Sequence, residues 1–318
     1  MRRARISDKE VMEALSLTAY ETTAVMFFII TLRYLIVSGT FYFVLKRPRW
    51  QHKRIHPDPP RREQLVQEIG WSIVSCLIFA LSGTAGDLAW KAGYTQVYLD
   101  VHRHGIAYLL LSVPLLMFLH DTYFYFAHRL MHHKVLFDRV HKVHHLSRNP
   151  SPWASFCFHP FEAFVEALIL PLLILVVPVH PIALLIFVTV MSVFGVVNHT
   201  GYELYSKEFV TNRWLSAWLT VTHHQMHHTH YRTNFGLYFT LWDRWLGTEH
   251  AKYAATFLRV KAQRSLVPAA AISPARLGLR LRPFARVAPR VVENAVHVGA
   301  LEGMAAEVVT QTLDEVRG

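Results

Sequence analysis

The chain has 318 residues, of which 52% are hydrophobic and 17% are charged, and its mean hydropathy is +0.22. This composition is unusual for a soluble protein and favours a membrane protein. The formal net charge is +11, but the basic residues occur in short runs beside long apolar segments, which suits anionic lipid headgroups, and we expect no nucleic-acid partner. The two cysteines, Cys76 and Cys157, are far apart and indicate neither a disulfide framework nor a thiolate metal site.

The first strongly apolar segment covers residues 19–45 and is long enough to cross a hydrocarbon layer of about 30 Å. We interpret it as a retained anchor, because it lacks a clear small-residue cleavage site. Arg33 interrupts it, and since a charge at that depth is costly against lipid, Arg33 either packs inside a helical bundle or shows that the true span is shifted. The basic segment at 46–63 then predicts a cytoplasmic loop by the positive-inside rule.

A second span is predicted at about 65–83, and a third apolar run leads from Ile106 into a histidine-rich block. Two further apolar arms cover 161–179 and 182–198, with a turn between them, and they form either two spans or a re-entrant hairpin. Either arrangement returns the chain to the side on which the histidines begin. The sequence therefore predicts an all-α, multi-pass transmembrane helical bundle of about four or five spans with a cytoplasmic histidine-rich helical cap.

Two regions of different composition divide the chain. Residues 1–264 are predicted to form the membrane-embedded domain with its cap. Residues 265–318 are rich in Ala and Arg and carry no metal-ligand pattern, so we expect a cytoplasmic tail, partly helical or disordered.

The first histidine block places four side chains on one helix face. Asp121, Tyr125, His128 and His132 follow the spacing i, i+4, i+7 and i+11. His128 and His132 can therefore offer two imidazoles to a metal, and Asp121 and Tyr125 are placed to orient them. His120 points about 100° away from this face and ranks below them.

Two HxxHH triplets repeat the pattern at 141–145 and 224–228, and with the first pair they bring the number of imidazoles to eight. The eight candidate ligands are His128, His132, His141, His144, His145, His224, His227 and His228. A closed tetrahedral zinc site needs four ligands, so we predict two metals that share one cluster. His199 is a candidate ninth ligand, Glu203 a candidate carboxylate near the metals, and His223 a supporting residue beside the second triplet.

Imidazole ligands suit Fe, Zn, Cu and Ni alike, so spacing alone leaves the metal open. A zinc pair would support hydrolysis, but the chain has neither a nucleophile elbow nor an HExxH helix. Iron would support O₂ chemistry on a membrane lipid, and we favour that interpretation. A metal-binding or metal-transporting protein is the alternative outside enzymes, although transporters place such ligands within their spans rather than past the ends.

The histidine motifs HxxxH, HxxHH and HxxHH resemble those of the fatty acid hydroxylase and sterol desaturase superfamily of membrane di-iron enzymes. The similarity runs from about Asp121 to Thr248. Within the superfamily the chain is most similar to the C-5 sterol desaturases, or lathosterol oxidases. That similarity is carried by SPWASFCFHPFEAF at 151–164, by HHQMHH with the following NFG, and by YFTLWDRWLGT at 238–248.

The resemblance implies that the eight histidines bind an iron pair and that His199 matches a further histidine of the pattern. It also suggests that His159 caps or orients an apolar arm. The NFG and LWDRWLGT segments look like an active-site lid or a cap core, with Asp243 and Arg244 as residues that form pairs.

The implied activity is O₂-dependent desaturation or hydroxylation of a sterol-like or other long apolar lipid. A hydroxylase of fatty acyl, sphingoid or carotenoid chains is the alternative. Zinc can replace iron in a purified protein. Because the chain carries no haem, flavin or NAD(P) motif, the resemblance implies an external electron donor such as cytochrome b5 or a ferredoxin. The expected location is the cytoplasmic membrane or the endoplasmic reticulum, with the histidines on the cytoplasmic side.

Overall fold

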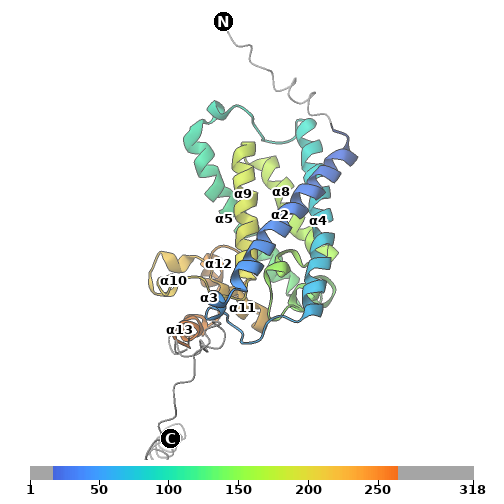
Figure 1. The fold of residues 1–318 in the computed structure, drawn as a ribbon. Coiled ribbons are helices and arrows are strands. Elements are labelled where there is room, and N and C mark those ends of the chain that lie inside the picture. Colours follow the sequence, from blue (N-terminus) through green and yellow to red (C-terminus); the bar gives the residue numbers. More distant parts are fainter. Residues whose placement is uncertain (1–16, 264–318) are drawn as a thin grey trace, which may run out of the picture. The chain divides into compact units, whose positions relative to one another are not determined.

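The computed structural model describes residues 17–263, which are mostly helical (Figure 1). The long helices are α2 (Ala19–Leu45), α4 (Arg62–Lys91), α5 (Gly105–Met131), α8 (Pro160–Val176) and α9 (Pro181–Asn198). The short ones are α3 (Pro48–Gln51), α6 (Phe137–Val140), α7 (Lys142–His145), α10 (Glu208–Thr211), α11 (Val221–His230), α12 (Leu241–Trp245), α13 (Tyr253–Gln263), η1 (Val101–Arg103), η2 (Pro152–Phe156) and η3 (Leu215–Ala217). Residues 17–263 contain isolated β-bridges but no strand, so the predicted all-α class is confirmed. The tail predicted at 265–318 lies outside the described residues.

Local sequence determines where several helices begin. At the start of α2 the Thr18 hydroxyl accepts the N–H of Glu21, and the Glu21 carboxylate accepts the N–H of Thr18. The N-caps of α8 and α9 are His159 and His180, whose rings accept the N–H two residues later, and a proline follows each of them. The expectation that His159 caps an apolar arm is therefore confirmed.

Four helices, α2, α4, α5 and α9, are long and apolar enough to cross a membrane. Many of their large apolar side chains are exposed, among them Phe28, Ile36, Leu111 and Leu185. Such surfaces are costly in water and stable against lipid acyl chains. Helix α8 is shorter, with 17 residues, and packs between the others. The prediction of a multi-pass bundle with about four or five spans is confirmed, with four candidate spans among the described residues.

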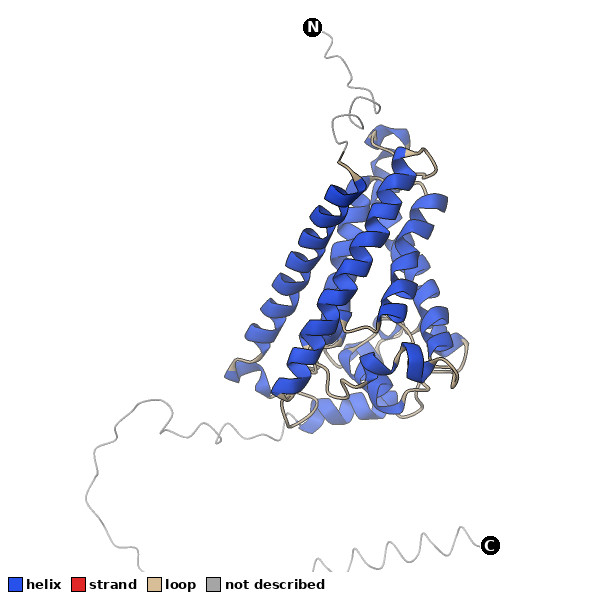
Figure 2. Cartoon of the chain, turned by 90° about the vertical axis from the view of Figure 1, so that its right-hand side faces the viewer, coloured by secondary structure: helices blue, strands red, loops and turns tan. Residues whose placement is uncertain are grey.

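Except for η1, the short helices gather at one end of the long helices (Figure 2). The basic loop after α2 lies at this end, because the N–H of Ile55 donates to the carbonyl of Gly201 and the Arg54 guanidinium donates to the Tyr202 hydroxyl. The segment that follows α9 is thereby joined to the loop that follows α2. The sequence-based topology, which brings both to the same side, is consistent with these contacts.

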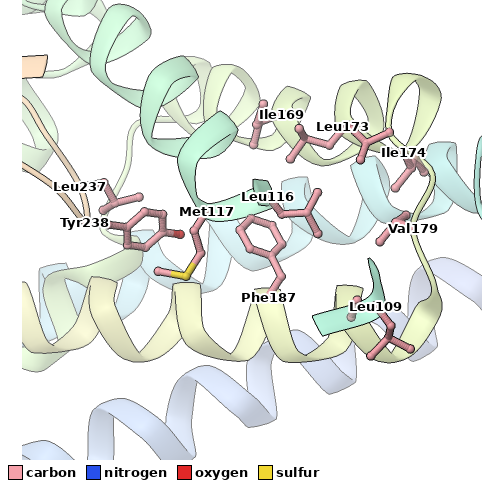
Figure 3. Packing of buried hydrophobic residues seen from close by; sticks show 12 residues of the cluster. Leu109, Leu116, Met117, Ile169, Leu173, Ile174, Val179, Phe187, Leu237 and Tyr238 are labelled. Atoms are coloured by element: carbon pink, nitrogen blue, oxygen red, sulfur yellow. The ribbon is translucent and has the colours of Figure 1, made fainter. Parts of the chain in front are cut away.

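The main core lies between α5, α8 and α9 and includes Leu116, Leu173 and Phe187 (Figure 3). Tyr238, from the loop after α11, packs into the same core and so links the helices to the short segments at their end. A second cluster joins α2, α4 and η2 through Tyr34, Cys76 and Trp153. Both cysteines are free and buried, as expected of small core residues.

The carbonyl of Trp153 accepts hydrogen bonds from the Tyr34 hydroxyl at 2.9 Å and the Ser72 hydroxyl at 3.0 Å. We expect Tyr34→Phe to destabilise the protein by about 1 kcal/mol, because one buried hydrogen bond is lost. Thermal unfolding in detergent should show a midpoint lower by about 2 °C. Tyr42→Phe is the matched control, because the Tyr42 ring also packs on Trp153 while its hydroxyl has no hydrogen bond among the described residues. Equal midpoints for the two variants would contradict this assignment.

Candidate metal centre

Histidine side chains converge in two sets at the end of the helices. The first set is His128, His132, His141, His145 and His227, and the second is His144, His199, His224 and His228. Within each set the nitrogens that could bind a metal all lie within 4.8 Å of one another. These are the nine histidines that the sequence predicts as ligands, and the structure brings all of them together.

Each sequence triplet contributes to both sets. In the triplet at 141–145 the first and last histidines belong to the first set, whereas His144 belongs to the second. In the triplet at 224–228 the arrangement is reversed, because His227 alone belongs to the first set. Positions i, i+3 and i+4 lie on one side of a helix, but the side chains at i+3 and i+4 are about 100° apart around its axis, so one HxxHH segment can serve two neighbouring sites.

Several rings are oriented by hydrogen bonds from Nδ1 to backbone carbonyl groups. The pairs and their N···O distances are His128–Phe235 at 2.9 Å, His144–Cys157 at 3.3 Å, His199–Gly195 at 2.7 Å and His227–Thr233 at 2.8 Å. A carbonyl oxygen can only accept, so Nδ1 carries the proton in each ring. In a neutral imidazole the other nitrogen, Nε2, then presents a lone pair.

These lone pairs face one another. The Nε2 atoms of His144 and His199 are 3.2 Å apart, and both rings already donate through Nδ1. Burial lowers the pKa of His199 to about 4 and the pKa of His144 well below its ordinary value, so both rings are neutral at pH 7. No proton is available for a hydrogen bond between the two nitrogens. Their mutual repulsion is relieved if a cation binds between them.

The spacing of the nitrogens also fits a bound metal. Contacts between Nε2 atoms range from 2.9 Å, for His199 and His224, to 3.2 Å, for His132 and His227. Nitrogens bound at about 2.1 Å from a metal are about 3.0 Å apart at a right angle and about 3.4 Å apart at the tetrahedral angle. Buried neutral imidazoles at this separation are suited to divalent transition metals.

Glu162 contacts one of these histidines directly. Its Oε1 lies 2.7 Å from Nδ1 of His141, and both side chains are buried. A carboxylate that accepts from Nδ1 fixes the ring and makes Nε2 a stronger ligand. Glu162 is not among the residues predicted from the sequence. The signal was available, because an acidic residue at the start of an apolar arm is costly unless it has a partner.

Asp121 acts on the centre through the loop that follows α11. Its Oδ1 accepts the backbone N–H groups of residues 237–239 at 2.7–3.3 Å. Among the described residues it forms no hydrogen bond with a histidine. Its effect on the site passes through the same loop to Phe235, whose carbonyl holds His128.

Tyr125 and Asp243 anchor the beginning of this loop. The hydroxyl of Tyr125 lies 2.8 Å from the hydroxyl of Thr248, which donates to Asp243 at 2.7 Å. Asp243 also accepts the N–H groups of Phe235 and Gly236, both at 2.9 Å. Arg244, the next residue, pairs with Glu249 rather than with its neighbour. Tyr125 therefore acts on His128 indirectly, through Thr248, Asp243 and Phe235.

Glu203 and His223 lie beside the two sets and belong to neither. Glu203 accepts the N–H of Thr222 at 2.7 Å and so stabilises the first turn of α11. His223 is fully buried, with its ring 4.0 Å from the Asp243 carboxylate. Burial lowers the pKa of His223 to about 3, so it is neutral at pH 7. The lower-ranked His120 is also outside both sets and contacts the Tyr238 hydroxyl.

An apolar cavity of about 500 Å³ lies among α2, α4, α5, α8 and α9. Phe124 and Phe158 line it. The ring centroids of Phe124 and His128 are 4.9 Å apart, and those of Phe158 and His144 are 5.1 Å apart. Gly195, whose carbonyl orients a histidine of the second set, also lines it. One layer of residues therefore separates the cavity from both histidine sets. Its volume and apolar walls suit a lipid.

Residues 113–248 match the model of the fatty acid hydroxylase family, and all nine histidines lie in this range. Over this region the chain is similar to the fatty acid hydroxylase family. The resemblance inferred from the histidine motifs is confirmed.

Individual proteins to which the chain is similar are sterol desaturases. The Delta(7)-sterol 5(6)-desaturase of Gibberella zeae is 28% identical over 67% of this chain and 62% of its own length. Human lathosterol oxidase is 29% identical over 64% of this chain and 66% of its own length. A Delta(7)-sterol 5(6)-desaturase of Aspergillus fumigatus is 29% identical over 76% of this chain and 77% of its own length. The chain thus spans less than two thirds of the first two relatives, and no solved structure matches it.

The contact between Glu162 and His141 leads to a prediction about metal affinity. We expect Glu162→Leu to weaken metal binding by about 10- to 100-fold and Glu162→Gln to weaken it less, because the amide oxygen still accepts from Nδ1. Competition with a chelator measures both affinities. Glu208→Gln is the control, since Glu208 is exposed on α10. Wild-type affinity in Glu162→Leu would show that this carboxylate does not support the site.

Gly236 allows the loop after α11 to fold tightly. A Cβ atom at this position would collide with the carbonyl oxygen of Phe239 and crowd the Asp243 carboxylate. We therefore expect Gly236→Ala to displace the neighbouring Phe235 carbonyl and to lower both the unfolding temperature and the bound metal per chain. Gly70→Ala, where no atom lies within 4 Å of the added carbon, should leave both unchanged or slightly raise stability. Equal metal content in the two variants would refute the role of the loop.

Proposed function

We propose that the protein is a membrane di-iron oxidoreductase that uses O₂ to desaturate or hydroxylate a sterol-like or other long apolar lipid. The observation that carries this proposal is the arrangement of two sets of neutral imidazoles one residue layer from a lipid-sized apolar cavity. The names of the relatives support it, because those proteins are sterol desaturases and lathosterol oxidases.

The two histidine sets would each hold one iron, with zinc able to replace it in a purified protein. Bound iron would supply the chemistry that the side chains lack, the activation of O₂ for attack on an unactivated C–H bond. The protein's own contribution is orientation and exclusion of water. Carbonyl groups and Glu162 turn the Nε2 atoms inward, and the aromatic rings of Phe124 and Phe158 separate the centre from the cavity.

Both possible reactions require an external reductant. Desaturation removes two hydrogen atoms from the lipid and reduces O₂ to two molecules of water, whereas hydroxylation leaves one oxygen atom in the product and releases one molecule of water. In each case the substrate supplies two of the four electrons and a donor supplies the other two. Cytochrome b5 or a ferredoxin is the proposed donor. The exposed side chains of Lys46, Arg47 and Arg49 at the histidine end favour an acidic partner surface.

We propose that the histidine end faces the cytoplasm, in the cytoplasmic membrane or the endoplasmic reticulum. The support is the basic loop after α2, which lies at the same end as the histidines, and the positive-inside rule. A reductant in the cytoplasm then reaches the centre without crossing the bilayer.

His144→Ala tests the proposed function. It removes one imidazole from the set of four, so we expect the iron content per chain to fall and O₂-dependent lipid oxidation to be lost. Metal analysis of the purified protein measures the first effect. Untargeted lipid mass spectrometry of cells with and without the gene measures the second, in which a loss of two hydrogens indicates desaturation and a gain of one oxygen indicates hydroxylation.

His133→Ala is the matched control, because His133 is exposed and lies in neither set. It should retain both metal and activity. Full lipid oxidation by His144→Ala, or a correctly folded wild-type protein that binds no iron, would overturn the proposal.

A further inference from the structure

Glu166 is an acidic side chain with no partner in the apolar cavity. It lies on α8 and lines the cavity, one helical turn after Glu162. Glu162 contacts His141, whereas Glu166 has no hydrogen bond or ion pair with any residue of the described part of the chain. A carboxyl group that faces an apolar space is costly without a partner and is usually functional.

Most other polar groups on the cavity wall already have partners. Asp87 pairs with Lys91 at 2.8 Å, and the Ser82 hydroxyl donates to the carbonyl of Ala167 at 2.7 Å. Among the described residues on the wall, Arg33 and Ser155 each have a buried polar atom with neither a hydrogen-bond nor an ion-pair partner, and with Glu166 they make three such residues. Glu166 is the acidic group of the three. A ligand in the cavity is therefore offered a carboxyl group, a hydroxyl group and a cation by otherwise apolar walls.

We propose that Glu166 binds a hydroxyl group of the lipid substrate, so that the substrate is a neutral lipid alcohol rather than a free fatty acid or an acyl thioester of coenzyme A. This inference rests on the proposed function and narrows its substrate class. A carboxyl group pairs with an alcohol in either protonation state, because the alcohol both donates and accepts. A carboxylate or phosphate on the ligand would meet Glu166 with like charge.

The position of Glu166 also indicates which part of the lipid is oxidised. Four residues along α8 correspond to about 6 Å, so the hydroxyl is held roughly that far beyond the carboxylate that contacts His141. The cavity continues away from the histidines to Trp90, Val97 and Pro181, where an apolar body or tail fits. The oxidised C–H bond is therefore close to the alcohol and not at the far end of the tail.

Arg33 defines the competing arrangement. It lines the same cavity from α2 and forms no ion pair within residues 17–263, so a lipid carboxylate could pair with it. In that case acids would bind more tightly than alcohols, and the preference would depend on Arg33 rather than on Glu166.

Equilibrium binding of matched probes to the full-length protein in detergent distinguishes these arrangements. The pairs are 5α-cholestan-3β-ol with 5α-cholestane, and octadecanol with octadecanoic acid. For the wild type we expect each alcohol to bind at least tenfold more tightly than its partner. Glu166→Leu should bring both ratios close to one, and Glu166→Gln should retain most of the preference because its amide still forms hydrogen bonds. The ratio of the affinities of two probes for one variant does not depend on the fraction of that variant that is folded.

Leu170→Ala is the control from the same wall and the same helix. It should weaken the binding of 5α-cholestan-3β-ol and of 5α-cholestane to the same extent, so that the ratio of their affinities is unchanged. An unchanged alcohol preference in Glu166→Leu, equal binding of the pairs to the wild type, or tight acid binding that Arg33→Met abolishes would each overturn the proposal.

The same measurement on His144→Ala separates this inference from the proposed function. Alcohol preference that persists in this variant while oxidation is lost supports both. If the protein binds no iron but discriminates through Glu166, the proposed oxidation fails and the alcohol site remains. If iron and oxidation are present but Glu166→Leu retains the preference, the alcohol site fails alone.

Discussion

The structure depends on the direction in which buried imidazole rings present their nitrogens. Four rings donate Nδ1–H to backbone carbonyl groups, so their Nε2 lone pairs point inward. Burial lowers the pKa of histidines in both sets, as for His144 and His145, and keeps them neutral at pH 7. Neutral lone pairs held about 3 Å apart are unfavourable without a cation. The backbone that positions these carbonyls therefore also shapes the two candidate metal sites.

The carbonyls come from segments far apart in the chain, and their positions require further anchors. Asp121, on the same helix as His128, holds the backbone of residues 237–239. Asp243 holds the preceding turn, which carries the carbonyl for His128. The two acidic side chains thus connect the end of α5 to the loop after α11. Helix α5 supplies both a histidine and the means of orienting it.

The cavity extends beyond the region matched by the family model. The match covers residues 113–248 and includes all nine histidines. The cavity wall also uses α2 and α4, which precede the matched region. Most of the rest of the wall, Glu166 included, comes from α5, α8 and α9 inside the matched region. The part of the wall that α2 and α4 supply can therefore vary without a change in the candidate metal ligands.

The sequence alone determined the helical class, the apolar segments and the nine candidate histidines, because these properties follow from local composition and the helical repeat. The first apolar segment predicted at 19–45 coincides with α2. Only the tertiary structure decided that each HxxHH triplet serves both sets, that Glu162 contacts His141, and that Glu203 and His223 lie outside the sets. Those outcomes depend on which side chains meet across helices and loops distant in the chain. Helical periodicity specifies a face, whereas the fold specifies what that face contacts.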